Sequence, residues 1–325
     1  MKALLCTELG PPSKLSIEEI EDPQPGPGEV VIDVEAAGLN FPDTLIIEGR
    51  YQVQPPLPFS PGGEAAGTVS AVGDAVRGVS VGDRVIAMSA HGAFAERWLV
   101  PAGSVIPMPD ALDSVTAAGF ALTYGTSYHA LEDRARLAAG ETILILGAAG
   151  GVGSAAIELA KHLGATVIAA ASTDEKLAFC EELGADHLID YTTEPLRDRL
   201  RELSDGRGVD VVFDPVGGEM TEAAFRSLAW NGRHLVIGFA SGDIPSLPVN
   251  LALLKGAALV GVFWGRSLTE EPETAFSNFG DLTRLVDEGH IRPRISDRFT
   301  LERYEEAFAV FENRSVMGKA VFVLQ

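Results

Sequence analysis

A glycine-rich loop between a buried strand and an amphipathic helix limits the possible folds most. The apolar run 142–146 is typical of a strand buried on both faces. The loop 147–154 follows, and apolar residues at helical spacing then predict a helix over 152–163 that ends at Gly164. The same strand–helix alternation continues along the chain. Parallel strands need crossover connections, so this alternation predicts a doubly wound, mostly parallel sheet.

Five more strands are expected in this part of the chain, and a second helix is capped by Ser172 or Thr173 and ended by Gly184. The expected strands are 166–171, 187–189, 209–213, 234–239 and 258–263.

The first ~120 residues predict short strands separated by glycine and proline turns rather than helices. After residue 264 we expect helices over 273–288 and 304–313 and a strand over 320–324. The predicted organisation is a β-rich, barrel-like domain over 1–121, an α/β domain over 122–263, and a tail over 264–325 that returns to the first domain.

The charge of the chain excludes several partners. The formal net charge is −21, which opposes binding to nucleic acid or to an anionic membrane surface.

No segment is long and apolar enough to predict a membrane span, and the first residues do not resemble a signal peptide. Cys6 and Cys180 are the only cysteines, so neither a disulfide framework nor a cysteine-rich metal site is expected, and a reducing cytoplasm fits.

The glycine loop has the chemistry of a dinucleotide site. In the pattern G-x-G-x-x-G, Gly150 and Gly153 match, while Ala148 stands in the first glycine place. Gly150 would let the backbone approach a diphosphate, Gly153 would let the helix pack closely, and the helix N-terminus would present N–H groups to phosphate. The alternative is a tight turn without a ligand.

The end of the second strand favours NADPH over NADH. An NAD site has an acidic residue there that binds the ribose 2′-hydroxyl, but this strand ends at Ala171-Ser172. Ser172 can donate to a 2′-phosphate, and the ammonium of Lys176 can neutralise it. The alternative for Lys176 is an ordinary solvated helix lysine. Asp174 and Glu175 add opposing charge nearby.

Together these motifs resemble the zinc-free NADPH:quinone oxidoreductase branch of the medium-chain dehydrogenase/reductase superfamily, which includes zeta-crystallin. The resemblance implies an α/β fold with a GroES-like β-rich catalytic domain, a Rossmann domain and an active site in the cleft between them. It spans the whole chain and rests on the blocks Gly38–Asp43, Pro58–Glu64, Gly82–Val85, Leu122–Thr126, Gly147–Gly153 and Phe213–Gly218.

The ligands that hold catalytic zinc in related alcohol dehydrogenases are absent. Asn40 stands near the place of their cysteine, Gly63 replaces their histidine, and their structural four-cysteine cluster is missing. We therefore predict no metal site. Chemistry without a Lewis acid disfavours simple alcohol oxidation and favours an already electrophilic acceptor such as a quinone or an enone.

Asn40, Tyr51 and Asp43 are the candidate catalytic residues. Tyr51 resembles the proton-donor tyrosine of mitochondrial-type enoyl thioester reductases, and a phenol can donate to a developing oxyanion. The alternative is a half-buried aromatic ring on a loop. Asn40 either orients the ligand or caps backbone groups, and Asp43 is expected to support the loop rather than act as a base.

The resemblance implies the remaining contacts. Asn40, Tyr51 and Asn250 would bind substrate, although Asn250 could equally cap a helix. His91 and His129 are expected to be structural, and Glu64 is expected to form an internal ion pair. The implied cofactor contacts, from the nicotinamide ribose through the diphosphate to the 2′-phosphate and the nicotinamide, are Thr123, Gly150, Gly151, Val152, Gly153, Ser172, Lys176, Tyr191, Phe239 and Phe263.

The resulting hypothesis is an NADPH-dependent quinone oxidoreductase without metal. One alternative is a 2-enoyl thioester or enone reductase, disfavoured because Arg50 is the only basic residue in the segment 40–64. Another is a crystallin-like nucleotide-binding protein with little catalysis. Whether electrons pass singly or as hydride stays open. The resemblance implies that the apolar edge strand ending at Phe263 pairs with its twin in a homodimer, and an exposed sheet edge otherwise promotes aggregation.

Overall fold

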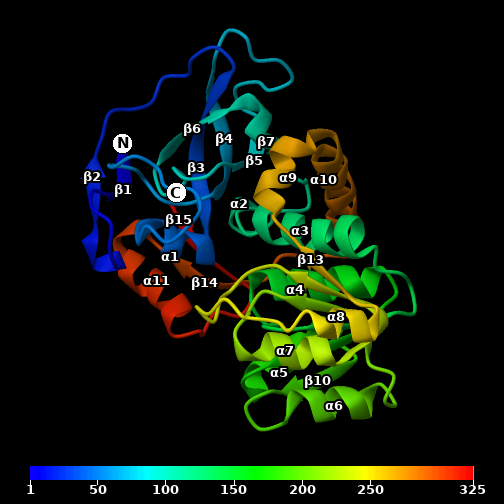
Figure 1. Cartoon of the computed structure of the whole chain (residues 1–325). Helices are drawn as coiled ribbons and strands as arrows, with labels where there is room; N and C mark the ends of the chain where they lie inside the picture. The colour runs from blue at the N-terminus through cyan, green and yellow to red at the C-terminus, as the bar shows by residue number, and fades with distance from the viewer. Residues whose placement is uncertain (325) are drawn as a thin grey trace. The chain divides into compact units, whose positions relative to one another are not determined.

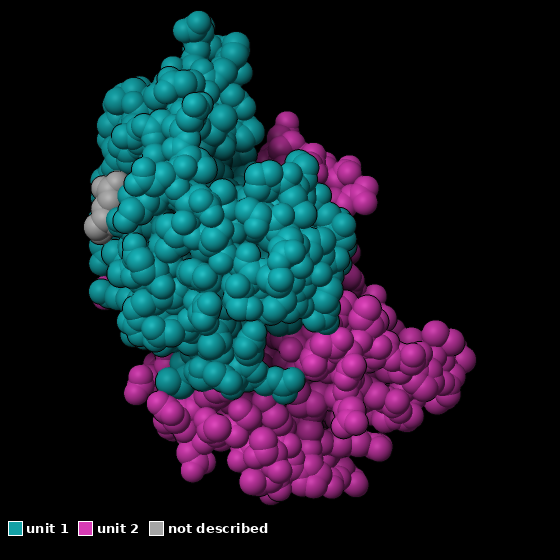
Figure 2. Space-filling view, turned by 90° about the vertical axis from the view of Figure 1, so that its left-hand side faces the viewer, with its two compact units in different colours: residues 1–122, 293–325 teal, residues 123–292 magenta. Residues whose placement is uncertain are grey.

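The computed structural model describes residues 1–324 and forms two compact units. The first contains Met1–Leu122 and the chain from Pro293 onward, and the second contains Thr123–Arg292 (Figure 2). The first boundary lies beside the predicted one at 121. The second differs from the predicted boundary at 264, because two helices after that position pack within the second unit. Trp264 lies edge-on to Phe279 at 6.1 Å and occupies the space that a side chain at Gly125 would need.

The first unit is β-rich, as the sequence predicts, and its described strand pairs are antiparallel except for the parallel pair 295–299 and 319–323. Among the described residues, β1 pairs with β2, and seven strands form one sheet in the order β14-β15-β3-β4-β5-β7, with β6 also paired to β3. The elements are β1 Lys2–Cys6, η1 Pro12–Lys14, β2 Leu15–Glu19, β3 Glu29–Leu39, α1 Phe41–Ile47, β4 Glu64–Val72, β5 Arg84–Met88, β6 Arg97–Pro101, η2 Ala102–Ser104, β7 Val105–Pro107, α2 Ser114–Ala117, β14 Ile295–Phe299, η4 Leu301–Arg303, α11 Tyr304–Glu312 and β15 Lys319–Val323 (Figure 1).

The tail closes this first sheet. The last strand, β15, pairs antiparallel with residues 36–39 of β3, while β6 pairs with residues 29–33 of the same strand. Phe94 packs edge-on against Phe308 and Phe322 in the core, so the tail also supplies aromatic rings to it. The short helices α1 and α2 are a correction to the strand-only prediction for this region.

The second unit contains a parallel sheet in the order β10-β9-β8-β11-β12-β13. Numbered from β8, this is the 3-2-1-4-5-6 order of dinucleotide-binding folds. The elements are α3 Ala121–Tyr128, which spans the boundary, the π-helix η3 His129–Ala135, β8 Thr142–Ile145, α4 Gly151–His162, β9 Thr166–Ala171, α5 Asp174–Glu182, β10 His187–Asp190, α6 Leu196–Leu203, β11 Val209–Asp214, α7 Glu219–Arg226, β12 Leu228–Val236, α8 Asn250–Lys255, β13 Ala258–Gly261, α9 Trp264–Glu270 and α10 Pro272–Asp287.

The helix and strand predictions in this unit are largely confirmed. Thr173 caps α5, its side chain accepting the N–H of Lys176 at 3.3 Å, and Gly164 and Gly184 take positive φ just beyond α4 and α5. The strand predicted over 234–239 is wrong in its limits, because β12 is Leu228–Val236. The chain leaves the sheet at Ile237, whose N–H donates to the Asp214 carbonyl oxygen at 2.9 Å.

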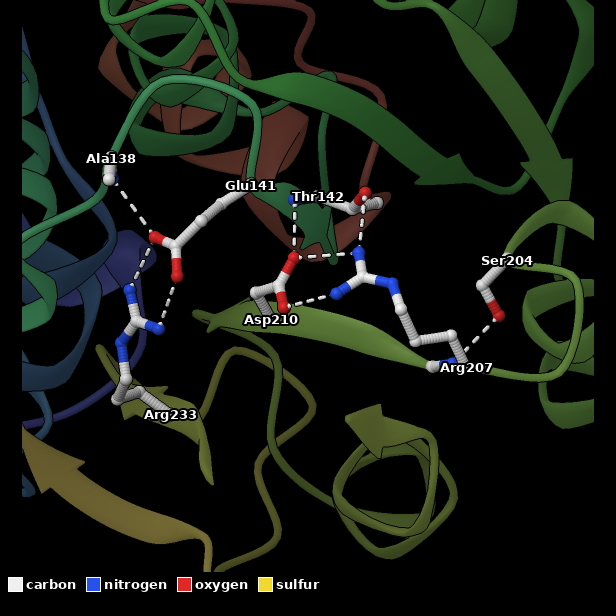
Figure 3. Close-up of polar contacts among 8 residues, drawn as sticks. Ala138, Glu141, Thr142, Ser204, Arg207, Asp210 and Arg233 are labelled. Carbon is white, nitrogen blue, oxygen red and sulfur yellow. Dashed lines mark hydrogen bonds and ion pairs between the residues drawn. The ribbon is translucent and has the colours of Figure 1, made fainter. Parts of the chain in front are cut away.

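Ion pairs join the amino ends of the central strands (Figure 3). Arg233 binds Glu141 through two bonds of 2.7 and 2.6 Å, and Arg207 binds Asp210 through bonds of 2.7 and 2.9 Å. Asp210 also accepts the N–H of Thr142 at 2.8 Å. These bonds tie the segments that lead into β8 and β11 to the strands of the sheet. Within residues 1–324, no helix is long and apolar enough to span a bilayer.

Candidate active site

The loop between β8 and α4 has the geometry of a diphosphate cradle. Gly147 has φ +56°, and the Gly150 N–H donates to its carbonyl oxygen at 3.0 Å. A Cβ at Gly153 would lie 2.5 Å from the Gly147 oxygen and 2.8 Å from Ala148 backbone atoms, so only glycine lets α4 approach this closely. The first turn, which starts with Gly151 and Val152, presents N–H groups that a helix does not use internally. These residues fit a dinucleotide diphosphate.

The carboxyl end of β9 brings together the residues predicted for a 2′-phosphate. The Lys176 ammonium donates to the Ser172 hydroxyl at 3.4 Å, and both residues lie in the loop and first turn that follow β9. The N–H of Tyr191, just after β10, donates to the Ala171 carbonyl oxygen at 3.3 Å. A hydroxyl and an ammonium therefore stand where an NAD site has a carboxylate, an arrangement that fits a phosphate ester better than a free ribose hydroxyl.

The residues predicted to bind the nicotinamide half lie on several separate elements. Phe239 packs against Gly217, whose added Cβ would lie 2.9 Å from the ring, and Thr123 is buried. Phe263 is about half exposed just before α9. Asn250 is the exposed first residue of α8, and Val249 occupies the cap position of that helix. Asn250 is therefore not the helix cap.

Asn40 and Asp43 form the start of α1. The Asn40 N–H donates to the Asp43 carboxylate at 2.7 Å, and the Asp43 N–H donates to the Asn40 carbonyl oxygen at 3.0 Å. An asparagine before a proline-containing first turn, with an acid three residues on, resembles the capping box of many helices. The expected loop-supporting role of Asp43 agrees with this geometry.

A buried ion pair holds the Asn40 side chain. The Lys319 ammonium contacts both a Glu64 carboxylate oxygen and the Asn40 amide oxygen. The Asn40 amide nitrogen donates to Glu64 at 3.0 Å, and the other Glu64 oxygen accepts the Leu122 N–H at 2.9 Å. Glu64 is fully buried and Lys319 is 4% exposed. The predicted internal ion pair of Glu64 is confirmed, and both hydrogen-bonding ends of the Asn40 amide are engaged by it.

The electrostatics of this cluster place a titrating acid near a phenol. Burial raises the pKa of Asp43 to about 7, while the Asn40 N–H and the Lys319 charge act in the opposite direction. Burial and the nearby Asp43 charge raise the pKa of Tyr51. Tyr51 follows α1 and is partly buried against the core of the first unit. Its phenol therefore keeps its proton at neutral pH and can act as a donor.

The sequence patterns assign no role to three residues that make buried polar contacts. Lys319 lies in the apolar-looking terminal strand, and its buried partners are more than 250 residues away in sequence. Asp214 lies within the motif block 213–218 and His234 at the start of the predicted strand 234–239, and their side chains pair in the second unit at 3.0 Å. A charged or imidazole residue within an otherwise apolar strand was the available signal.

The two histidines set aside from chemistry have local partners. The imidazole of His129 bonds the Asp133 carboxylate at 2.7 Å within the π-helix. The carbonyl oxygen of His91 accepts the Trp98 indole N–H at 3.1 Å. Over residues 1–324, no group of three or more histidine, cysteine or acidic side chains is arranged to hold a metal ion.

Comparison with known proteins gives the same two parts. Residues 26–110 match the alcohol dehydrogenase GroES-like domain, and residues 151–280 match the family described as zinc-binding dehydrogenase. Quinone oxidoreductase-like protein 2 of Mus musculus is 38% identical over 325 residues, covering all of this chain and 92% of the mouse protein. Quinone oxidoreductase of Pseudomonas aeruginosa is 35% identical, covering 99% of each chain.

A solved structure of a mycobacterial protein complexed with NADPH superposes with a TM-score of 0.93 at 34% identity, covering 99% of this chain and 100% of the other. Similarity of this extent involves both units and the motif blocks on which the predicted resemblance rests. The chain therefore belongs to the medium-chain dehydrogenase/reductase family of oxidoreductases, in its zinc-free quinone oxidoreductase branch.

Proposed function

We propose that this chain reduces quinones or similar electrophilic acceptors with NADPH. The observation that carries the cofactor assignment is the Ser172–Lys176 contact at the end of β9, in the same unit as the Gly153 cradle. The mycobacterial relative, which is complexed with NADPH, supports it. The mouse relative is a quinone oxidoreductase-like protein and the Pseudomonas relative is a quinone oxidoreductase, which supports a quinone as the acceptor.

The residues of this chain have distinct parts in the proposed mechanism. Bound NADPH supplies a hydride. The first turn of α4 binds the diphosphate, and Lys176 neutralises the 2′-phosphate. Tyr51 donates its phenolic proton to the acceptor oxygen that becomes negative, and solvent then reprotonates the phenolate. Asn40 and Asp43 fix the start of α1 ahead of Tyr51 rather than exchanging protons with the acceptor.

The proposal is tested by following NADPH absorbance with three acceptors. A polycyclic ortho-quinone and a para-benzoquinone should each be reduced faster than crotonyl-CoA. Faster turnover with crotonyl-CoA would instead favour the enoyl thioester reductase. Binding of NADPH with no turnover of any acceptor would favour the crystallin-like alternative.

Lys176→Ala should raise the KM for NADPH by about tenfold and leave the KM for NADH nearly unchanged, because a charged hydrogen bond to phosphate is lost only with NADPH. Lys14→Ala, which removes an exposed lysine of the first unit, is the matched control and should change neither value. An equal rise with both cofactors would remove Lys176 from the 2′-phosphate site. Steady-state kinetics with each cofactor in turn gives the answer.

We also propose that the protein is a homodimer in a reducing cytoplasm, consistent with its buried cysteine thiols Cys6 and Cys180. The edge strand β13, the neighbouring β12 and α8, and the residues that flank β13 and α8 carry large exposed apolar side chains, as a subunit interface does. These side chains are Trp230, Val249, Leu253, Leu254, Leu259 and Phe263.

Light scattering after size exclusion should give about twice the 34.3 kDa chain mass. Leu253→Lys combined with Leu259→Lys should give a monomer, because both charges would be buried in the interface. Phe276→Lys on α10, where the ring is equally exposed, should leave the dimer intact. A monomeric wild-type protein would contradict the dimer.

A further inference from the structure

A buried carboxylate organises the turn after β11. Asp214 is 3% exposed and accepts the N–H groups of Val216 at 2.9 Å and Gly217 at 2.8 Å. It also accepts the Thr221 hydroxyl at 2.7 Å and His234 Nε2 at 3.0 Å. Burial raises the pKa of this carboxyl, but the hydrogen bonds from His234 and Gly217 outweigh it and hold the pKa below its usual value. The group is therefore an ionised acceptor shared by β11, α7 and β12.

The imidazole of His234 makes one hydrogen bond among the residues described. The side chain is fully buried, its Nε2 donates to Asp214, and its Nδ1 has no partner among the residues described. The ring lies beside Phe225, with 5.8 Å between ring centroids. A buried ring nitrogen without a hydrogen-bond partner lowers stability, so an apolar ring would be the better choice for packing alone. What the histidine contributes is the proton on Nε2.

The turn held by Asp214 carries the loop that follows β12. The Ala240 N–H donates to the Pro215 carbonyl oxygen at 3.0 Å, and the Ser241 N–H donates to that of Val216 at 2.9 Å. In the return direction, the Gly218 N–H donates to the Asp243 carbonyl oxygen at 3.1 Å. The two loops are thus joined through main-chain bonds. The position of one fixes the other.

The same turn also meets the cofactor loop. A Cβ at Gly147 would lie 2.9 Å from the Val216 side chain. In the 3-2-1-4-5-6 order, a dinucleotide crosses the carboxyl edge of the sheet at β8. With Ser172 and Lys176 on the β9 side, the other half of the dinucleotide faces the loops after β11 and β12.

We propose that Asp214, His234 and Thr221 are positioning residues for the nicotinamide half of the dinucleotide, an inference that rests on the proposed function. They touch neither cofactor nor acceptor. They set the paired loops 214–218 and 237–243 against which the nicotinamide half binds, while the adenosine half depends on the β9 side. Loss of the His234 donor therefore weakens binding of the whole cofactor more than binding of its adenosine half.

The test compares NADPH with 2′-phosphoadenosine diphosphoribose, which lacks the nicotinamide, by isothermal titration calorimetry. His234→Leu should raise the Kd for NADPH about tenfold and that for the shorter ligand by less than about twofold. His234→Gln, which can place an amide donor near the Nε2 position, should restore most of the NADPH affinity. An equal change for both ligands, or no change for either, would overturn the proposal.

Two further variants separate positioning from general destabilisation. Thr221→Val is a milder change and should also raise the Kd for NADPH more than the Kd for the shorter ligand. It replaces His234→Leu in the test if that variant does not fold. Leu200→Ala, in the buried face of α6, should lower the melting temperature and leave the ratio of the two affinities unchanged. Wild-type protein that binds no NADPH would contradict the proposed function itself. Wild-type binding with an unaltered ratio in Thr221→Val would contradict only this inference.

Discussion

Replacing Lys319 with methionine is expected to lower the free energy of unfolding by about 3–5 kcal/mol. The ammonium is buried against the Glu64 carboxylate and the Asn40 amide, and methionine has a similar length without the charge. The variant leaves the fully buried Glu64 carboxylate without a cation, which is the source of the loss. Urea unfolding followed by fluorescence and circular dichroism measures it.

Two further comparisons isolate the charge. Glu64→Gln combined with Lys319→Met should be more stable than Lys319→Met alone, because no ionised carboxylate is then left behind. Lys14→Met breaks an exposed pair with Glu8 and should cost about 0–1 kcal/mol. A loss for Lys319→Met no larger than that of the exposed pair would show that the buried pair is not ionised.

The pH dependence of this variant follows from Asp43. In the folded protein burial raises its pKa to about 7 from an ordinary 3.8, so the folded state binds the proton more tightly and stability falls as pH rises across that interval. The Lys319 charge lowers the pKa of Asp43, so removing this charge raises that pKa further and extends the interval to higher pH. The stability loss of Lys319→Met should therefore be larger at about pH 8, where Asp43 is ionised, than at about pH 5.

Tyr51→Phe is expected to lower kcat with a quinone acceptor by about 100-fold, with little change in the KM for NADPH. The substitution removes only the hydroxyl, and the ring stays packed against the core of the first unit. Burial and the Asp43 charge raise the pKa of the phenol, so it is protonated at neutral pH. Steady-state kinetics at saturating NADPH measures the effect.

Tyr304→Phe is the matched control for the tyrosine change. Its hydroxyl donates to the Leu15 carbonyl oxygen at 3.0 Å in the same unit, so its loss should lower stability slightly and leave kcat unchanged. Equal kcat for wild-type and Tyr51→Phe proteins would return Tyr51 to a packing role. If Tyr51→Phe lowers both kcat and the melting temperature, its kcat is compared with that of Tyr304→Phe under conditions where the two variants are equally stable. A lower kcat in Tyr51→Phe under those conditions supports the proton donor.

The helices and strands of the second unit are predicted well because each depends on residues close together in the sequence. The run into Gly147, the spacing of Gly150 and Gly153, and the cap at Thr173 each act within one turn of the chain. The parallel direction of the strands then follows from the strand–helix alternation, because parallel strands need crossover connections. The Ser172–Lys176 contact was also accessible, since residues four apart on a helix start lie on one side.

The interior of the first unit could not be predicted in the same way. Asn40 and Asp43 are predicted to lie in a loop, whereas they start α1, because proline in a first turn is compatible with a helix. The pairing of Lys319 with Glu64 depends on β15 lying next to β3, a contact that no periodicity encodes. The helices α9 and α10 lie in the second unit because of the Trp264 packing, which is also non-local.

The order in which the ribosome releases these parts has a consequence for biogenesis. The second unit is one uninterrupted stretch and is fully synthesised before β14 and β15 emerge. Until then β3 pairs with β4 on one side but lacks its β15 neighbour along residues 36–39, and Glu64 lacks the Lys319 countercharge. The nascent protein therefore completes its nucleotide fold first, and residues 1–122 keep an open sheet edge, which chaperones can bind, until β15 is translated.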